Sequence, residues 1–191
     1  MSDSPADKAA LRRLALARRD ALPPEARAVA SGQVADLLFA LPELARHGLV
    51  SAYWPIRSEL DLRPLLQRLR ARGQAVALPQ VTPNGLVFRL VGEGEHLARG
   101  GFGLSEPGPD APVVRPRALL VPLAAFDRRG HRIGYGKGYF DRALADLDRD
   151  GPLDAIGVAF AAQEVERVPD QPYDRRLGRI VTEAGLIDTG A

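Results

Sequence analysis

The sequence contains no cysteine among its 191 residues. Disulfide bonds and metal sites built on thiolates are therefore excluded, because both require that side chain. The three histidines, His47, His96 and His131, are scattered without the spacing of metal ligands, so a zinc site is not expected. His131 is expected to be a solvated loop residue. No Gly-x-Ser-x-Gly sequence occurs, so the chain offers no nucleophile elbow of the serine-hydrolase kind.

Long apolar runs are also missing. No stretch approaches the ~18 consecutive apolar residues that a membrane-spanning helix needs. The first ten residues are polar and lack the apolar core of a signal peptide. The sequence therefore predicts a cytoplasmic protein that does not enter a membrane.

Neither sign of charge dominates. Lys and Arg number 26 against 24 Asp and Glu, which gives a formal net charge of +2, although the pI is about 9.3. A nucleic-acid binder typically carries a basic stripe interleaved with aromatic residues. Here cations and acids are interleaved along the chain, and only 6% of the residues are aromatic. The composition favours a small anionic ligand and argues against nucleic acid as a partner.

The composition that remains is that of a folded globular protein, with 46% hydrophobic and 26% charged residues. A chain of this length fits one domain and buries roughly two-thirds of its unfolded surface on folding. We find no internal repeat and no linker, so a single domain over residues 1–191 is expected.

Helical spacing of apolar residues predicts two helices at the start of the chain. The first begins with Ser4 as its N-cap and Pro5 at its first position, and continues to Leu22. The second covers residues 23–41. Helices and strands then alternate, and residues 92–116 show no periodicity. Strands are predicted at 49–54, 75–78 (ending at Pro79), 86–91, 118–122, 156–160 and 180–182, and helices at 62–72 and 139–147.

This alternation predicts the α/β class. We expect a three-layer α/β/α domain with a mostly parallel, Rossmann-like sheet, opened by the two N-terminal helices. Sheets of this kind bind ligands beyond the carboxyl ends of their strands, in the loops that follow. The loop after the strand at 118–122 is therefore the first place to search for a site.

That loop, residues 126–141, combines glycine with charge. Its glycines alternate with other residues: Gly134, Gly136 and Gly138. Glycine lets a ligand approach the backbone closely, and successive N–H groups ahead of a helix form a pocket for phosphate. Arg132 and Lys137 add positive charge, and Asp141 offers a carboxylate suited to Mg²⁺.

The same spacing is also typical of a glycine-rich surface turn with solvated charges. The segment is not a P-loop, because it lacks a Gly, four residues and then Gly-Lys-Ser/Thr. It is not a dinucleotide fingerprint either, because Tyr139 stands where the third glycine belongs. Spacing alone therefore indicates a phosphate loop without identifying its ligand.

The residues themselves carry a more specific signal. The run at 132–142 reads Arg-Ile-Gly-Tyr-Gly-Lys-Gly-Tyr-Phe-Asp-Arg and follows Pro-Leu-Ala-Ala-Phe-Asp at 122–127. It resembles the signature of the 5-formyltetrahydrofolate cyclo-ligases, also called methenyltetrahydrofolate synthetases. Ile133 replaces a family Leu, and Phe140 replaces a family Tyr. Further matches lie at 103–107 and at Gln163 and Pro169, so that the resemblance extends over residues 8–183.

The resemblance implies roles for named residues. ATP binding falls to two segments, the N-terminal helix and the glycine loop: Lys8, Arg12, Arg132, Ile133, Gly134, Tyr135, Gly136, Lys137, Gly138, Tyr139 and Phe140. Catalysis falls to Lys137 and Arg132. Magnesium binding falls to two carboxylates, Asp141 and Asp174. Trp54 and Glu59 are implied to bind the folate substrate.

Residues outside the loop also have ordinary interpretations. Lys8 and Arg12, four residues apart, are typical of a solvated helix face. Trp54 fits a core aromatic, Glu59 an acid ahead of the next helix, and Asp174 an exposed acid in a turn. The sequence leaves these alternatives open.

The activity that the resemblance implies is conversion of 5-formyltetrahydrofolate to 5,10-methenyltetrahydrofolate with ATP and Mg²⁺, giving ADP and phosphate. The formyl oxygen would be phosphorylated and N10 would then close the ring. A monomer acting on small molecules is expected. Three rivals stay open: an ATP-dependent phosphotransferase or ligase with another anionic substrate, a non-catalytic binder of folate or nucleotide, and a nucleic-acid binder.

Overall fold

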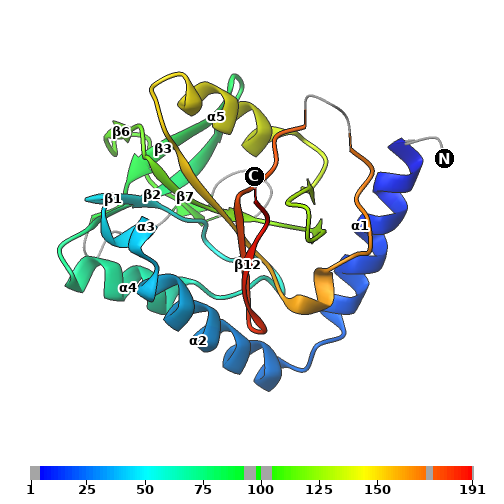
Figure 1. The fold of residues 1–191 in the computed structure, drawn as a ribbon. Coiled ribbons are helices and arrows are strands. Elements are labelled where there is room, and N and C mark those ends of the chain that lie inside the picture. The colour runs from blue at the N-terminus through cyan, green and yellow to red at the C-terminus, as the bar shows by residue number, and fades with distance from the viewer. Residues whose placement is uncertain (1–4, 93–97, 100–104, 171–173, 191) are drawn as a thin grey trace.

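The computed structural model describes residues 5–92, 98–99, 105–170 and 174–190. Its centre is an eight-stranded sheet of order β12-β11-β10-β7-β1-β2-β3-β6 (Figure 1). The inner strands run parallel: β1 (Leu49–Ser51), β2 (Ala75–Thr82), β7 (Ala118–Pro122), β10 (Asp154–Val158) and β11 (Arg179–Thr182). The antiparallel strands lie at the margins: β3 (Gly85–Leu90), β6 (Val113–Val114) and β12 (Gly185–Asp188). The predicted mostly parallel sheet is confirmed.

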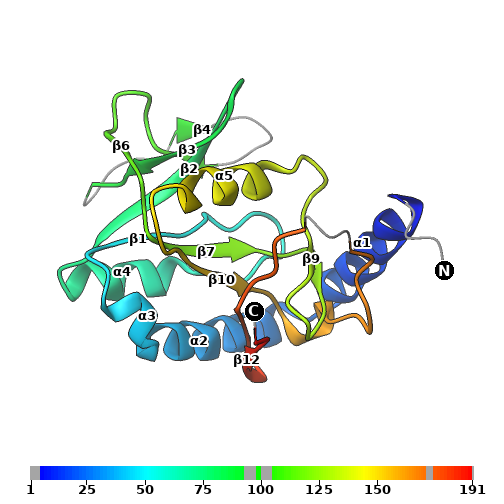
Figure 2. The same ribbon diagram turned by 45° about the horizontal axis from the view of Figure 1, so that its top comes forward.

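Helices cover both faces of this sheet (Figure 2). Ala118 and Leu120 of β7 pack in one core cluster with α2 (Pro24–Ala40), α3 (Pro42–Ala45) and α4 (Arg63–Ala71). Leu119 and Val121 pack in a second cluster with α5 (Tyr139–Asp148). Because successive side chains of a strand point to opposite faces, these two clusters lie on opposite sides of the sheet. The result is the predicted three-layer α/β/α arrangement.

The first helix, α1 (Pro5–Asp20), has a different position. It packs against β8 (Ala125–Phe126) and the 3₁₀ helix η2 (Ala161–Gln163), both of which follow the carboxyl ends of inner strands (Figure 2). The predicted N-cap, Ser4, lies outside the described residues. The N-terminal helix therefore borders the region where a sheet of this class places its ligands.

The first two predicted strands end at other residues than expected. The strand predicted at 49–54 ends at Ser51, before the chain reaches Trp54. The strand predicted to end at Pro79 continues to Thr82. Backbone groups of successive residues face alternate neighbours, so Pro79 faces the side of β1, as Ala77 does. Since β1 pairs no further than Ala77, the missing N–H of Pro79 removes no ladder hydrogen bond.

Other differences concern short elements. The strand predicted at 156–160 lies at Asp154–Val158, two residues earlier. Several elements were not predicted, because each is too short to show a period: α3, η2, β12, β8 with its partner β9 (Arg132–Ile133), and β4 (Ala98–Arg99) with its partner β5 (Ser105–Glu106). No helix within the described part of the chain is long and apolar enough to span a membrane.

Two glycines give opposite expectations for alanine substitution. Gly130 has a φ of +88°, and a Cβ there would lie 2.4 Å from the carbonyl oxygen of Leu177. Gly32 lies in α2, where a Cβ would meet nothing within 4 Å. We expect Gly130→Ala to lower the free energy of unfolding by roughly 2–3 kcal/mol. Gly32→Ala should raise it by about 0.5–1 kcal/mol. Urea unfolding followed by circular dichroism measures both changes, and equal stabilities would contradict the local geometry.

Candidate active site

The candidate site lies at the carboxyl ends of two neighbouring parallel strands, β1 and β7, whose following connections run to opposite sides. From β1 the chain crosses through α4 to β2, whereas from β7 it crosses through α5 to β10 on the other side. The two crossover helices pack on opposite faces, so β1 and β7 form a topological switch point. Loops separate at the carboxyl ends of such strands and leave room for a ligand. Glu59 follows β1, and the glycine loop follows β7.

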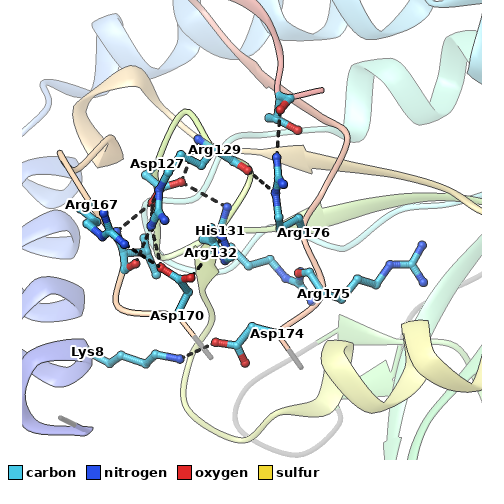
Figure 3. A network of polar contacts seen from close by, with 12 residues as sticks. Lys8, Asp127, Arg129, His131, Arg132, Arg167, Asp170, Asp174, Arg175 and Arg176 are labelled. Atoms are coloured by element: carbon cyan, nitrogen blue, oxygen red, sulfur yellow. Dashed lines mark hydrogen bonds and ion pairs between the residues drawn. The ribbon is translucent and has the colours of Figure 1, made fainter. Parts of the chain in front are cut away.

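A buried carboxylate anchors the hairpin that leads into the glycine loop (Figure 3). Asp127 is fully buried and accepts hydrogen bonds from the backbone N–H groups of Arg129, His131 and Val168, at 2.9, 3.2 and 2.9 Å. Its Oδ2 also lies 2.7 Å from Nη2 of Arg129. This hairpin pairs β8 with β9, so Asp127 fixes the point from which Arg132 and the glycines emerge.

His131 is not the solvated residue that the sequence suggested. It is 8% exposed, and its Nε2 lies 3.6 Å from Oδ2 of Asp170. Its Nδ1 has no hydrogen-bond partner among the described residues. The burial follows from the turn at Gly130, whose carbonyl accepts the N–H of Leu177 at 3.0 Å and so holds the hairpin against the C-terminal segment.

The glycine loop places donors ahead of α5. Gly136 and Gly138 have φ values of +93° and +62°, which side chains with a Cβ rarely adopt. Gly138 is the N-cap of α5, and no side chain of the described residues caps that end. The first N–H groups of an uncapped helix are available to an anion, and the helix dipole favours negative charge there.

Three predicted cations contact the glycine loop, the start of α5 or the C-terminal segment beside them. Nε of Arg12 donates to the carbonyl of Gly134 at 2.7 Å, and Nζ of Lys8 lies 2.9 Å from Oδ2 of Asp174. Nη2 of Arg132 lies 2.5 Å from Oδ1 of Asp141 (Figure 3 shows Arg132 with Lys8 and Asp174). The interpretation of Lys8 and Arg12 as a merely solvated helix face is therefore wrong, because both contact segments that lie more than 100 residues away.

Arg132 is held more firmly than a surface cation. Its side chain is 6% exposed, and its Nη1 donates to the carbonyl of Arg175 at 2.7 Å. Burial lowers the pKa of Arg132, while Asp141 and Asp174 act in the opposite direction. Lys137, in contrast, is exposed between the two left-handed glycines. Of these two cations of the glycine loop, Arg132 is therefore buried and Lys137 is exposed.

Two predicted members of the loop are core residues by their side chains. Ile133 is 3% exposed and packs with Val165 and Val168, and Phe140 packs against the cluster under α5. Ile133 therefore has only its backbone groups left for a ligand, whereas the half-buried Phe140 keeps part of its ring accessible. The apolar packing of Phe140 also explains why a ring without the family hydroxyl fits here. Tyr139 is half-buried, with the guanidinium of Arg142 5.3 Å from the centre of its ring.

Glu59 connects the loop after β1 to the glycine loop. Its Oε1 accepts a hydrogen bond from the hydroxyl of Tyr135, and its Oε2 accepts the N–H of Ile56 at 3.0 Å. Burial raises the pKa of Glu59, and these two hydrogen bonds oppose that rise. Because its carboxylate is engaged by Tyr135 and α4 begins only at Arg63, Glu59 is not simply an acid at a helix start.

Trp54 lies on the same loop but in different surroundings. It is half-buried against the core cluster under α2 and α4, and the guanidinium of Arg63 lies 5.8 Å from the centre of its ring. These contacts agree with the alternative of a core aromatic, and its role in substrate binding stays a prediction.

Asp141 and Asp174 are the candidate magnesium ligands. Both carboxylates favour the charged form of Arg132 and oppose the fall of its pKa, so both lie near this one cation. Asp141 is in the first turn of α5 with 66% of its side chain exposed, and the side chain of Asp174 is 31% exposed. Nowhere in the described ranges do three or more His, Cys, Asp or Glu gather as a complete metal cage. Two carboxylates near the glycine loop are of the kind that Mg²⁺ binds, and this ion commonly takes its other ligands from phosphates and water.

Comparison with known proteins bears on what this arrangement does. The sequence model of the 5-formyltetrahydrofolate cyclo-ligase family matches residues 4–183. The chain belongs to the 5-formyltetrahydrofolate cyclo-ligase family. It is therefore an enzyme of the ligase class, and the resemblance described from the glycine loop is confirmed over nearly the whole sequence.

Individual relatives agree with this family. The 5-formyltetrahydrofolate cyclo-ligase of Escherichia coli K12 is 31% identical over 172 residues, covering 86% of this chain and 94% of that protein. The cyclo-ligase of Mycolicibacterium smegmatis is 30% identical over 189 residues, covering 94% and 95%. The structure of 5,10-methenyltetrahydrofolate synthetase from Aquifex aeolicus superposes with a TM-score of 0.84 at 33% identity, covering 96% of this chain and 93% of that one.

Sequence reasoning missed one buried residue that contacts this candidate site, Arg19. It is 2% exposed, and its Nη1 donates to the hydroxyl of Tyr135 at 2.7 Å. A signal existed, because Arg19 lies seven residues after Arg12 and eleven after Lys8, which places all three on one face of α1. This signal is weak, because arginine is seldom fully buried and a shared helix face is also typical of solvated cations.

Proposed function

We propose that this chain converts 5-formyltetrahydrofolate and ATP into 5,10-methenyltetrahydrofolate, ADP and phosphate, with Mg²⁺. One observation carries the proposal: the glycine loop after β7 and the Glu59 loop after β1 touch through the hydrogen bond from Tyr135 to Glu59. A nucleotide on the first loop and a pterin on the second would therefore lie side by side. Transfer of a phosphoryl group between two ligands requires such proximity.

The nucleotide phosphates would bind at the glycine loop. Backbone N–H groups of residues 134–138 and of the uncapped start of α5 would donate to them, and Lys137, Arg132, Lys8 and Arg12 would balance their charge. Asp141 and Asp174 would hold Mg²⁺, which when bound neutralises charge on the phosphate oxygens. Phosphoryl transfer is catalysed mainly by positioning and by this neutralisation, which matches a site rich in cations and backbone donors.

The reaction needs activation because a formamide carbon is a weak electrophile and its oxygen a poor leaving group. We propose that the formyl oxygen attacks the γ-phosphorus, while the bond to the bridging oxygen breaks and ADP leaves. N10 then attacks the activated carbon, the carbon–oxygen bond breaks, phosphate leaves and N10 loses its proton. Lys137 and Arg132 hold the transferred group, and the Glu59 carboxylate accepts hydrogen bonds from the polar edge of the pterin. No step requires a nucleophilic side chain.

The direct test is the absorbance of the methenyl product. Folded protein mixed with 5-formyltetrahydrofolate, ATP and Mg²⁺ should develop that absorbance, and omission of ATP should abolish it. An absence of ATP-dependent product would overturn the proposal. Thermal unfolding tests the rival hypothesis of an ATP-dependent enzyme with another anionic substrate. A ligand that binds only the folded protein must raise its melting temperature. We expect 5-formyltetrahydrofolate to raise the melting temperature.

Cytoplasmic location, a monomeric state and no binding of nucleic acid remain part of the proposal.

A further inference from the structure

A chain of hydrogen bonds joins α1 to both candidate ligand loops. Nη1 of Arg19 donates to the Tyr135 hydroxyl at 2.7 Å, and that hydroxyl donates to Oε1 of Glu59. Nε and Nη2 of Arg19 both lie 3.1 Å from Oδ1 of Asp20. Burial of a guanidinium is unfavourable unless its donors are satisfied, and these bonds supply the partners. The chain therefore connects three elements that are far apart in sequence.

The direction of these bonds is fixed by chemistry. Arginine has donors and no acceptor, so the Tyr135 oxygen must accept from Arg19. The one proton of that hydroxyl is then left for Glu59, which lies at the other end of the chain. Without Arg19, the Tyr135 oxygen would lose the donor on its other side and would be held less firmly. An ionised Glu59 can only accept, so the hydroxyl donates to it, and Arg19 holds the Tyr135 oxygen at the position from which it does so.

We propose that Arg19 is a positioning residue of the cyclo-ligase reaction, which acts through Tyr135 to hold the Glu59 carboxylate in the orientation that binds the folate. This inference rests on the proposed function and adds a residue to its site. Because Arg19 is 2% exposed, it is not available for direct contact with a substrate. Its effect passes through the Tyr135 hydroxyl, which also joins the nucleotide loop to the folate loop.

The charges around Glu59 agree with this role. Burial raises the pKa of Glu59, whereas Tyr135, the N–H of Ile56, Arg19 and Arg57 oppose the rise. The neighbouring Tyr53 is a further titratable group that faces Glu59, and burial holds its pKa above the ordinary value. Removal of the Arg19 charge should raise the pKa of Glu59 further. Since the ionised form is the one that accepts, the acid limb of kcat/KM should then move to higher pH.

The test compares Arg19→Gln with Arg18→Gln, a matched control one residue away. Arg18 is exposed, and among the described residues it donates to the carbonyl of Glu164 alone, at 3.3 Å. We expect Arg19→Gln to raise KM for 5-formyltetrahydrofolate about tenfold or more and to change KM for ATP less than about twofold. The acid limb of kcat/KM should shift upward in pH. Arg18→Gln should leave all three quantities unchanged.

Further variants separate positioning from a loss of folding. Tyr135→Phe removes the intermediate hydroxyl and should raise the folate KM to a similar extent. If Arg19 acts through that hydroxyl, Arg19→Gln added to Tyr135→Phe should change the folate KM less than about twofold more. Arg19→Lys keeps the charge and one donor, so it should regain part of the wild-type KM and pH profile. If Arg19→Gln does not fold, Arg19→Lys takes its place in the comparison with Arg18→Gln.

The outcomes distinguish this inference from the proposed function. An active wild-type protein whose folded Arg19 variants keep its folate KM and pH profile overturns the inference and leaves the function standing. Effects of Arg19→Gln and Tyr135→Phe that simply multiply also overturn it, because two independent residues would then be acting. A wild-type protein without ATP-dependent turnover overturns both proposals.

Discussion

Replacement of Lys137 by alanine should lower kcat/KM for ATP by about 100- to 1,000-fold, the range found when a charge-stabilising group is removed from a transition state. The side chain is exposed on the glycine loop, between two residues with left-handed backbone. It contributes no buried packing, so the free energy of unfolding should change by less than about 0.5 kcal/mol. Steady-state kinetics with varied ATP, beside urea unfolding, measure both quantities.

The matched control for this prediction is Arg149→Ala. Arg149 is also an exposed cation, 79% exposed at the end of α5, and its Nη1 lies 3.6 Å from Oδ1 of Asp146. The substitution removes the same charge from the surface, at the end of the helix away from the glycine loop. If both variants lost activity equally, the effect would reflect overall charge, and the assignment of Lys137 to the phosphates would be wrong.

The second catalytic candidate, Arg132, should behave differently from Lys137. Its side chain is 6% exposed and bonds both Asp141 and the carbonyl of Arg175. Arg132→Ala would leave these acceptors without their donor and open a space in the site. Turnover and stability should therefore fall together, so this variant does not separate the catalytic role of Arg132 from its structural role. The sequence presents both residues as loop cations and gives no reason to expect this difference.

The sequence predicts the inner sheet well because of where those strands lie. A parallel strand covered on both faces must be apolar throughout, as the run at 118–122 is, and this pattern is visible without tertiary information. The marginal and hairpin strands carry no such signature. β8 and β9 are two residues each and depend on the buried Asp127 that joins their ends. A contact of this kind appears only when the chain is folded.

The candidate site likewise has one part that the sequence predicts and one part that it does not. The glycine loop is contiguous, so its residues and spacing can be recognised in one segment. The bond between Tyr135 and Glu59 joins residues 76 positions apart, and Arg19 lies 116 positions from Tyr135. Local pattern cannot pair such residues. What brings them together is the adjacency of β1 and β7, combined with the position of α1 across the carboxyl ends of the strands.

Glu59→Gln is expected to have the second large effect, a loss of about 100-fold or more in kcat/KM for 5-formyltetrahydrofolate, with KM for ATP nearly unchanged. Both carboxylate oxygens accept hydrogen bonds from fixed donors, the Tyr135 hydroxyl and the N–H of Ile56. An amide of the same shape has one oxygen and would turn its NH₂ toward one of those donors. Steady-state kinetics with varied folate measure the loss. Glu166→Gln, at an exposed position, is the control and should keep wild-type kinetics.

Stability should respond to pH in a way that ties this loss to the carboxylate. Because burial raises the pKa of Glu59, its stabilising contribution is full below the ordinary pKa of a glutamate and disappears as the pH rises through the raised value. The free energy of unfolding of the wild type should therefore rise relative to that of Glu59→Gln as the pH falls. The variant should be most stable relative to the wild type at neutral pH. Urea unfolding of both proteins across this pH range checks the direction. A pH-independent difference would mean that Glu59 is not a desolvated carboxylate, and a variant with wild-type folate kinetics would remove it from the substrate site.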